Sequence, residues 1–420
     1  MKIRTTHAQS AFLGICLGAL AAQPALASGT ALRPGYPTDF IPAGISADGS
    51  AVSGAFPGYS GWPYSSGPTG QLWRDGAGFS QVGYAWFQPG RHAISADGNK
   101  IAGSAFATRS DPHSGACVWD VREATATNPL AQTWSGQGIA LTPDGSTMVW
   151  SDNSARYGVF IWNGVTNELI ENDSPRVAAV SSDGSVVAYY AYNLQGFRLW
   201  TRAGGLAALA PLPGMTFGGE DVVVSADGMR LYATARTPES EVVVRWDRAQ
   251  ATAGNAAGAA EVVCSVPRNA NPNAYLTLAG VSTDERTIVF SVDEHSYHWT
   301  VEAGVQDFES FLVSRDIEFG AGGCGTVLCM NADASTFAGV AGSFWYLDLN
   351  NAPRFCPADF NFDRTVNDAD FVSFAGAYDL FDCSDPDMPD ACPSDINRDG
   401  AVDDADFVLF VTAYDTLLCD

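Results

Sequence analysis

A short motif recurs seven times between residues 30 and 350, and this repetition constrains the fold more than any other feature of the chain. Each copy reads apolar, Ser or Thr, any residue, Asp, Gly; the last two copies are degenerate. The motif aspartates, which follow one another at similar intervals, are Asp48, Asp97, Asp144, Asp183, Asp227, Asp284 and Asp333. An apolar run with a tryptophan follows each motif: Trp73, Trp119, Trp162, Trp200, Trp246, Trp299 and Trp345. This ordered pairing indicates seven copies of one structural unit.

Asp-Gly between two short apolar runs is typical of a tight hairpin turn, because Gly accepts a positive φ and Asp bonds nearby amides. We therefore interpret the motif aspartates as turn residues rather than catalytic acids. The flanking runs lack a helical period, which predicts short strands and a four-stranded antiparallel sheet per unit. Seven such sheets bury their faces when arranged radially, so we predict a seven-bladed β-propeller over residues 28–350. A two-sheet sandwich or an open solenoid is the alternative architecture.

The repeat units resemble a known type of extracellular repeat. Residues 44–49 read Gly-Ile-Ser-Ala-Asp-Gly, and an Arg-Trp or Leu-Trp strand follows in several units. Over residues 40–346 this pattern is similar to the HAF-type repeats of secreted bacterial proteins. The resemblance implies an extracellular location and a repeat fold, and it implies no particular reaction.

The tail of the chain, residues 356–420, contains a second repeat, in which the same residues recur 36 positions later without drift. Each copy holds Asp-x-Asn-x-Asp followed by further oxygen-bearing residues, the pattern of a 12-residue loop that supplies Ca²⁺ ligands from positions 1, 3, 5, 7, 9 and 12. In the first loop these are Asp359, Asn361, Asp363, Thr365, Asn367 and Asp370. In the second loop they are Asp395, Asn397, Asp399, Ala401, Asp403 and Asp406. The sequence therefore predicts two Ca²⁺ sites, with position 7 binding through its backbone carbonyl.

The two loops differ at position 6, where the chain must turn sharply. Gly400 suits this position in the second loop, whereas Arg364 occupies it in the first and predicts a weaker or distorted site. After each loop, aromatic residues at i, i+3 and i+7 predict a short helix with these residues on one face. These are Phe371, Phe374 and Tyr378, and Phe407, Phe410 and Tyr414.

Residues 356–420 resemble a type I dockerin. The resemblance rests on loop-helix units without an entering helix, on Asp at position 12, and on two tandem copies at the end of the chain. It implies a small α-helical domain that folds around two Ca²⁺ ions and docks onto a cohesin module of a scaffold or cell-surface protein. Asp368-Ala369 and Asp404-Ala405 stand where dockerins usually carry a Ser/Thr recognition pair. The alternative role for Ca²⁺ is purely structural, since metal binding and folding are coupled.

Residues 1–27 are typical of a secretory signal peptide, with basic Lys2 and Arg4, an apolar run, and small residues before Ser28. The run is too short to span a bilayer, and no later stretch reaches about 18 apolar residues. We therefore expect a secreted protein, extracellular or at the cell surface, with no membrane span. Residues 351–355 are the expected linker between the propeller and the tail.

Eight cysteines remain once the segment with Cys16 is removed, and an even number in an oxidising compartment predicts disulfides. The four tail cysteines allow three pairings, all compatible with the repeat. We favour Cys356–Cys383 with Cys392–Cys419, which close two spans of equal length. We also expect Cys324 to pair with Cys329, which leaves Cys117 and Cys264 unassigned.

The charge of the chain is strongly negative and unevenly distributed. The formal net charge is −25, and residues 356–420 hold 16 Asp against two Arg. This surplus of acidic residues argues against nucleic acid as a partner, because proteins bind phosphate backbones through a surplus of Lys and Arg. The concentrated carboxylates of the tail instead suit a cation site.

Two other groups of residues are candidate sites. His295 and His298, beside Asp293 and Glu294, suit a metal site but are better explained as part of a repeat strand. Aromatic residues of the first repeat suit stacking on sugar rings, although packing at the propeller seam explains them more simply. They are Phe56, Tyr59, Trp62, Tyr64, Tyr84, Trp86 and Phe87.

We therefore expect a non-enzymatic, secreted, calcium-binding scaffold. Its propeller would be a platform for carbohydrate or protein, and its tail would dock to a cohesin-type or surface protein. The alternative is a polysaccharide-degrading enzyme, a glycoside hydrolase or lyase, delivered by its dockerin-like tail. O-glycosyl hydrolysis would require paired carboxylates about 5 to 9 Å apart at one mouth of the propeller.

Overall fold

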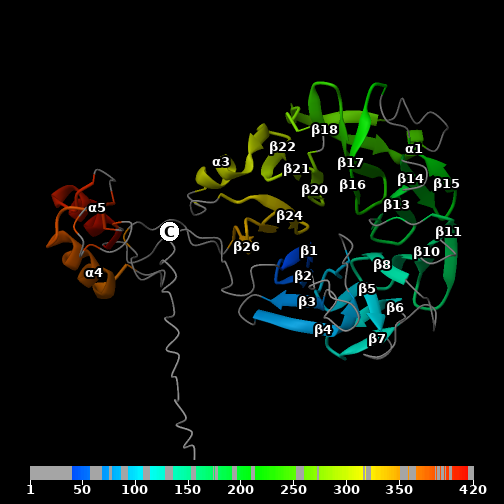
Figure 1. Cartoon of the computed structure of the whole chain (residues 1–420), viewed down its shortest axis with the longest axis horizontal. Helices are drawn as coiled ribbons and strands as arrows, with labels where there is room; N and C mark the ends of the chain where they lie inside the picture. The colour runs from blue at the N-terminus through cyan, green and yellow to red at the C-terminus, as the bar shows by residue number, and fades with distance from the viewer. Residues whose placement is uncertain are drawn as a thin grey trace, which may run out of the picture.

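The structure is a computed structural model of the whole chain (Figure 1), and the part of it that can be described comprises the following residues. They are 40–56, 69–74, 78–86, 93–106, 114–127, 136–152, 158–173, 175, 178–191, 196–209, 213–251, 260–271, 274–315, 317, 323–350, 358, 366–383, 385, 388, 392, 394–396 and 400–414. The predicted signal peptide, the linker 351–355, and six of the predicted Ca²⁺ ligands lie outside these residues. Those ligands are Asp359, Asn361, Asp363, Thr365, Asn397 and Asp399.

The described residues form seven antiparallel sheets arranged around a common centre (Figure 1). The chain is thus a seven-bladed β-propeller, as the repeat predicts, and the sandwich and solenoid alternatives are wrong. Blade 1 contains β1 (Ile41–Ile45), β2 (Ala51–Phe56), β3 (Thr69–Arg74) and β4 (Gly78–Trp86). Blade 2 contains β5 (Lys100–Phe106), β6 (Ser114–Asp120) and β7 (Thr125–Thr127), and Ile94 bridges to Ile101 in the innermost position.

The next three blades each have four strands in chain order. Blade 3 contains β8 (Gly136–Leu141), β9 (Met148–Asp152), β10 (Gly158–Trp162) and β11 (Asn167–Glu171). Blade 4 contains β12 (Ala178–Val180), β13 (Val186–Ala191), β14 (Gly196–Thr201) and β15 (Gly205–Ala208). Blade 5 contains β16 (Thr216–Val224), β17 (Arg230–Arg236), β18 (Ser240–Asp247) and β19 (Ala260–Pro267).

Blades 6 and 7 complete the circle, and blade 7 lies next to blade 1. Blade 6 contains β20 (Leu276–Val281), β21 (Thr287–Val292), β22 (His295–Thr300) and β23 (Gly304–Asp307). Blade 7 contains β24 (Thr326–Met330), β25 (Thr336–Val340) and β26 (Phe344–Asp348). Helix α1 (Arg248–Ala251) follows β18, and α3 (Phe308–Val313) covers part of blade 6.

The seven repeat tryptophans all lie on the third strand from the centre of their blade, on β3, β6, β10, β14, β18, β22 and β26. Five of them are buried against a neighbouring sheet: Trp73, Trp162, Trp200, Trp246 and Trp345. The tryptophans therefore occupy equivalent positions in the seven blades. This explains why one tryptophan follows each motif turn along the sequence.

The motif forms the turn between the first and second strands of each blade. In blade 4, Ser181 donates its hydroxyl to Asp183 Oδ1 at 2.7 Å, and the Ser185 N–H donates to the same oxygen at 2.9 Å. Ser181 Oγ in turn accepts the Val186 N–H at 3.0 Å. The other five Ser and Thr motifs repeat the hydroxyl-to-aspartate bond at 2.6 Å. The motif aspartates are turn residues, as predicted.

The residue after the motif aspartate also contacts the preceding blade. Gly228 has φ +68°, and a Cβ built on it would lie 2.6 Å from Val186 Cγ2 of blade 4. At the equivalent position of blade 6 stands Glu285, with φ +59°, and its carboxylate forms a 2.8 Å ion pair with Arg230 of blade 5. Glycine at this position therefore allows both the positive φ of the turn and close packing on the neighbouring blade. In blade 6, the ion pair of Glu285 with Arg230 takes the place of that packing.

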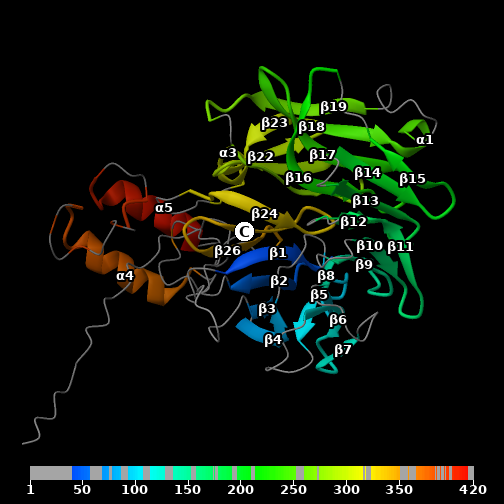
Figure 2. The same ribbon diagram turned by 45° about the vertical axis from the view of Figure 1, so that its right-hand side comes forward.

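The tail consists of two helices, α4 (Asp368–Tyr378) and α5 (Asp404–Tyr414), which form a separate unit (Figure 2). Both helices lie where the aromatic spacing predicts them. Phe374 and Phe410 stack at their centre, with ring centroids 5.1 Å apart. The three aromatic positions do not share one buried face, however, because Phe371 and Tyr378 lie at the exposed edge of the pair. Ala377 instead completes the buried face of α4.

The disulfide pattern corrects two predictions. Cys383 is bonded to Cys392, so the favoured pairing of Cys356 with Cys383 and Cys392 with Cys419 is wrong. The reason is an antiparallel bridge between Asp382 and Ala401, which brings the end of the first repeat against the second loop.

Cys324 and Cys329 keep separate thiols. Cys329 lies on β24, whereas Cys324 precedes that strand, with Gly325 at φ +58° between them. Cys324 packs with α3 and β26, whereas Cys329 packs in a different cluster with Phe40 and Trp73.

Candidate functional site

The described ends of both predicted Ca²⁺ loops have the same local structure. Asn367, at position 9, caps α4 by accepting the Ala369 N–H at 2.8 Å, while Asp370 Oδ2, at position 12, accepts the Asn367 N–H at 3.0 Å. In the second loop Asp403 and Asp406 make the equivalent bonds at 2.8 and 3.0 Å. Positions 9 and 12 therefore form a capping box that fixes the carboxylates at the start of each helix.

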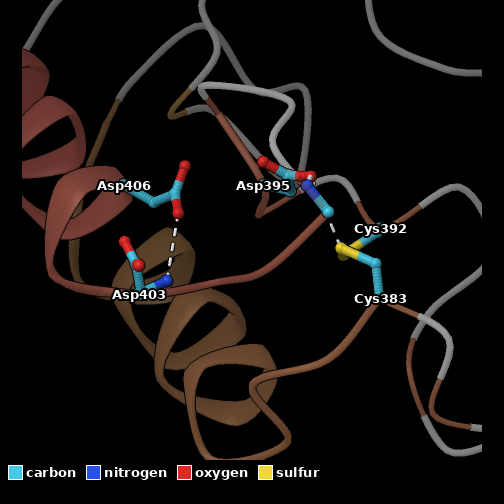
Figure 3. Close-up of a disulfide and its surroundings, with 6 residues drawn as sticks. Cys383, Cys392, Asp395, Asp403 and Asp406 are labelled. Carbon is cyan, nitrogen blue, oxygen red and sulfur yellow. Dashed lines mark hydrogen bonds between the residues drawn. A yellow bond between two sulfur atoms is a disulfide. The ribbon is translucent and has the colours of Figure 1, made fainter.

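The start of the second loop is held by backbone bonds. Asp395 Oδ2, at position 1, accepts the Gly400 N–H at 2.8 Å, and Gly400 has φ +94° at the sharp turn of position 6. Residues after α4 then pair with this loop: the Val402 N–H donates to Phe381 O at 2.7 Å, and the Cys383 N–H donates to Gly400 O at 3.2 Å. Figure 3 shows Asp395, Asp403 and Asp406 around this loop.

The donor set of the loops fits Ca²⁺. Every ligand predicted for either loop offers oxygen, the donor that this hard cation prefers. Asp370 and Asp406 are fully buried, and burying a carboxylate is costly unless hydrogen bonds or a cation compensate its charge. Val366 and Val402, at position 8 of each loop, are also fully buried and anchor both loops in the helix core. Of the predicted ligands, the structure describes Asn367, Asp370, Asp395, Ala401, Asp403 and Asp406.

A pair of tyrosine–aspartate bonds links the two helices, and the sequence analysis missed it. The Tyr378 hydroxyl donates to Asp404 Oδ1, and the Tyr414 hydroxyl donates to Asp368 Oδ1, both at 2.5 Å. These bonds raise the pKa of both tyrosines. The signal was available, because both members of the second bond are the repeat equivalents of the members of the first. Asp368 and Asp404 are therefore engaged in bonds between the two tail helices.

The outer faces of α4 and α5 carry large exposed apolar residues. Val372 and Val408, which are equivalent in the two repeats, are 71% and 62% exposed. They are joined by Phe371, Phe407, Leu409 and Val411. Exposed apolar residues on a small acidic unit are candidates for an interaction site.

The propeller has a cavity of 370 Å³ at the end of its central channel where the motif turns lie. Its wall is built from the first strands of all seven blades, and no Asp or Glu is among the described residues that line it. This mouth therefore does not supply the carboxylate pair that the hydrolase alternative requires there.

The rim of the cavity carries backbone hydrogen bonds between several pairs of neighbouring blades, each donated by the residue before a motif aspartate. The Ala47 N–H donates to Ala96 O at 2.9 Å, and the Ala96 N–H donates to Pro143 O at 2.7 Å. At the seam between blades 7 and 1, the side-chain amide of Asn331 donates to Ala47 O at 3.2 Å. A side-chain hydrogen bond thus links the last blade to the first.

Comparison with known proteins finds likeness in fold alone. No protein-family model matches the chain, and no curated protein matches it. The structure is similar to that of hydrazine synthase from Kuenenia stuttgartiensis, with a TM-score of 0.47 and 15% identity, over 76% of this chain and 98% of that chain. It is also similar to TolB from Acinetobacter baumannii, with a TM-score of 0.41 and 12% identity over 62% of this chain and 64% of that chain.

A further similar structure is a putative TolB from Agrobacterium tumefaciens. Its TM-score is 0.38 and its identity is 12%, over 54% of this chain and 81% of that chain. Such a likeness does not carry a function from one protein to another. Function must therefore be argued from the residues of this chain.

The histidine pair does not form a metal site in the structure. His298 is buried against Phe311, with ring centroids 3.8 Å apart, while His295 is exposed at the start of the same strand. Among the described residues, one group of three metal-ligating side chains meets closely, and it contains neither histidine. Of the aromatic residues of the first repeat, Tyr59, Trp62, Tyr64 and Phe87 lie outside the described residues, and Phe56, Tyr84 and Trp86 lie on β2 and β4.

The helices that the structure describes are all short. The longest, α4 and α5, have 11 residues each, and none of the described helices has the length and apolar character needed to cross a bilayer.

Proposed function

We propose that the protein is a secreted calcium-binding scaffold. Its propeller is a binding platform for a protein or carbohydrate partner, and its tail binds two Ca²⁺ ions and docks to a cohesin-type or other surface protein. Three features support this proposal: the oxygen-only loops, the capping boxes that fix positions 9 and 12, and the exposed apolar faces of the tail helices. The signal-like sequence of residues 1–27 supports secretion.

The exposed apolar face of α4 and α5 carries the docking proposal. Exposed apolar surface is unfavourable in water, and a partner that covers it removes that cost. The face lies on the two helices whose first turns complete the calcium loops, so Ca²⁺ would order the same elements that present it. The acidic tail favours a partner whose surface is basic around an apolar centre.

The docking test uses full-length protein and a cohesin module immobilised on a biosensor surface. We expect binding in Ca²⁺ and its loss in a chelator. Val372→Asp and Val408→Asp together should weaken binding at least about tenfold, because each buries a charge at the contact. Val165→Asp is the matched control, since Val165 is 88% exposed on the propeller. Equal binding by the double variant and the control would show that this face does not dock.

The calcium test is calorimetric titration of the full chain. We expect two sites, with the first weaker because Arg364 stands at its turn. Asp370→Asn should weaken the first site and Asp406→Asn the second, since each replaces the carboxylate at position 12 with an amide that has one oxygen and no charge. Asp379→Asn, an exposed aspartate just after α4, is the control and should leave both sites intact. A chain that takes up no Ca²⁺ would refute the assignment of the tail.

The propeller partner is tested separately. A glycan array and a reducing-sugar release assay, both with the full chain, distinguish a carbohydrate platform from the hydrolase alternative. We expect binding without release, because the channel mouth is lined without carboxylates. Release of reducing sugar would contradict the scaffold proposal.

A further inference from the structure

Two cysteines and a carboxylate meet beside the second loop of the tail. The Sγ atoms of Cys383 and Cys392 and a carboxylate oxygen of Asp395 all lie within 4.8 Å of one another (Figure 3). Cys383 Sγ is 3.5 Å from Asp395 Oδ2. Cys383 and Asp395 are half-buried and Cys392 is the most buried of the three, so the cluster is reachable from solvent on one side. The two sulfurs are joined as a disulfide in the structure.

The positions of these side chains are set by backbone contacts as well as by the disulfide. The Gly400 N–H fixes Asp395 Oδ2 at 2.8 Å, and the Cys383 N–H donates to Gly400 O at 3.2 Å. The bridge between Asp382 and Ala401 holds the same two segments together. Opening the disulfide would therefore leave both thiols and the carboxylate close to one another.

We propose that reduction of the Cys383–Cys392 disulfide creates a binding site for a thiophilic divalent cation such as Zn²⁺, with Cys383, Cys392 and Asp395 as ligands. Two thiolates and one carboxylate are a donor set that suits Zn²⁺, with a water in the fourth position. In a tetrahedral site with ordinary bond lengths, a sulfur and an oxygen ligand lie about 3.5 Å apart. The separation of Cys383 Sγ and Asp395 Oδ2 already matches that edge.

The chemistry of the change is thiol–disulfide exchange followed by metal binding. A dithiol reductant gives two electrons and two protons to the disulfide, so that the S–S bond breaks, two thiols form, and the reductant becomes a disulfide. The cation then displaces both thiol protons, which leave to solvent, and forms two metal–sulfur bonds. Oxidation reverses the sequence and expels the cation.

The site has a consequence for the calcium loop, and this consequence rests on the proposed calcium function. Asp395 is position 1 of the second loop, so a cation held by the two thiolates would take a ligand from Ca²⁺. The disulfide would then keep Asp395 available to Ca²⁺, and reduction would shift the loop toward Zn²⁺. The metal site itself does not depend on calcium binding.

The experiment uses the full chain with Cys356→Ser and Cys419→Ser, so that Cys383 and Cys392 are the remaining cysteines of the tail. Co²⁺ replaces Zn²⁺ as the probe, because thiolate ligation of Co²⁺ gives charge-transfer absorption and tetrahedral d–d bands. A phosphine reductant opens the disulfide without binding the metal. We expect one Co²⁺ per chain in reduced protein, none in oxidised protein, and displacement by Zn²⁺.

Variants assign the ligands. Cys383→Ser should abolish the thiolate bands, and Asp395→Asn should weaken Co²⁺ binding at least about tenfold, while Asp395→Glu, which keeps the carboxylate, should retain it. The helical circular dichroism of each sample shows whether the tail stays folded.

Several results would overturn the proposal. They are absence of the bands from reduced protein, their persistence in Cys383→Ser, binding unchanged in Asp395→Asn, or loss of helix on reduction alone. Failure of the calcium function is separable, because it appears in the Ca²⁺ titration of oxidised protein and leaves the Co²⁺ result standing.

Discussion

The Tyr378 hydroxyl at the end of α4 donates a 2.5 Å hydrogen bond to Asp404 in the first turn of α5. Tyr414 makes the same bond to Asp368 in the opposite direction. The end of each tail helix is thus tied to the beginning of the other, next to the capping box that holds positions 9 and 12 of a predicted calcium loop. This reciprocal arrangement gives the tail an internal two-fold symmetry that matches its sequence repeat.

Removing one of these hydroxyls should loosen the helix pair. Tyr378→Phe and Tyr414→Phe are each expected to lower the melting temperature of the tail by a similar amount, because the two bonds are equivalent. The bonds hold the pKa of both tyrosines above the usual value, so the stabilisation is complete below about pH 10 and is lost as pH rises further. Thermal melts at neutral and alkaline pH measure both effects. Unequal effects of the two variants would contradict the symmetry.

Substitution of Gly228 by alanine should destabilise the protein more than the same substitution at a glycine that has no atoms nearby. Gly228→Ala places a Cβ against Val186 and also adopts a positive φ. Gly164→Ala is the matched control, with φ +88° and nothing within 4 Å. We expect the backbone strain to be similar, at about 1 kcal/mol, and the Gly228 variant to lose a further ~1–3 kcal/mol through overpacking. Denaturant unfolding of the propeller measures both, and equal losses would contradict the role of this glycine in blade packing.

Asn331 should contribute more to stability than the serines at the same position of other blades. Its side chain accepts the Ser335 and Thr336 N–H groups and also donates across the seam to Ala47 O. Asn331→Ala should cost about 1–3 kcal/mol of unfolding free energy, because it leaves buried backbone groups unsatisfied. Ser181→Ala, which removes the local turn bonds alone, is the control and should cost less. A smaller effect of Asn331→Ala would show that the seam is held elsewhere.

His298 should make the propeller less stable in mild acid. Burial lowers its pKa from 6.5 to about 4, with a smaller contribution from nearby Arg315. Between these values the unfolded chain takes up a proton and the folded protein does not, so stability falls as pH decreases from about 6.5 to 4, by up to about 3 kcal/mol. His298→Gln should flatten this dependence, whereas His295→Gln, at an exposed position, should not. Unfolding titrations at pH 7 and pH 5 measure the difference, and an unchanged slope in His298→Gln would refute it.

The symmetry of the tail also predicts its second disulfide. Cys392 is the repeat equivalent of Cys356, and Cys419 is the repeat equivalent of Cys383, so the observed bond leaves Cys356 and Cys419 as the remaining pair. We expect non-reducing peptide mapping to recover Cys383–Cys392 and Cys356–Cys419. Recovery of Cys356–Cys383 would contradict both the observed bond and the symmetry.

The sequence predicts the architecture because the turn residues act locally. Ser181, Asp183 and Gly184 define one turn by bonds within six residues, and such local chemistry is readable without a structure. The same holds for the start of α4, where Asn367 and Asp370 form a capping box. Repetition at regular intervals then indicates how many units must pack together.

The contacts between units could not be read in the same way. Nothing near Asn331 in the sequence indicates that its amide reaches Ala47, 284 residues away. Equal spans favoured the wrong tail disulfide, because the bridge of Asp382 to Ala401, which brings Cys383 to Cys392, forms only in three dimensions. Cys324 and Cys329 are close in sequence and yet face different cores. Two residues that are close in sequence can therefore place their side chains in different parts of the core.

The seam between blades 7 and 1 has a mechanical consequence. Any force applied through the tail enters the propeller at the end of β26, and it must pass to blade 1 through non-covalent contacts. They include the amide of Asn331 on Ala47 O, the hydroxyl of Tyr346 on Gly49 O at 2.8 Å, and the packing of Phe40 on Phe344. A pulling experiment would therefore open the ring here first, so that the protein would yield by unwinding one blade at a time from this end.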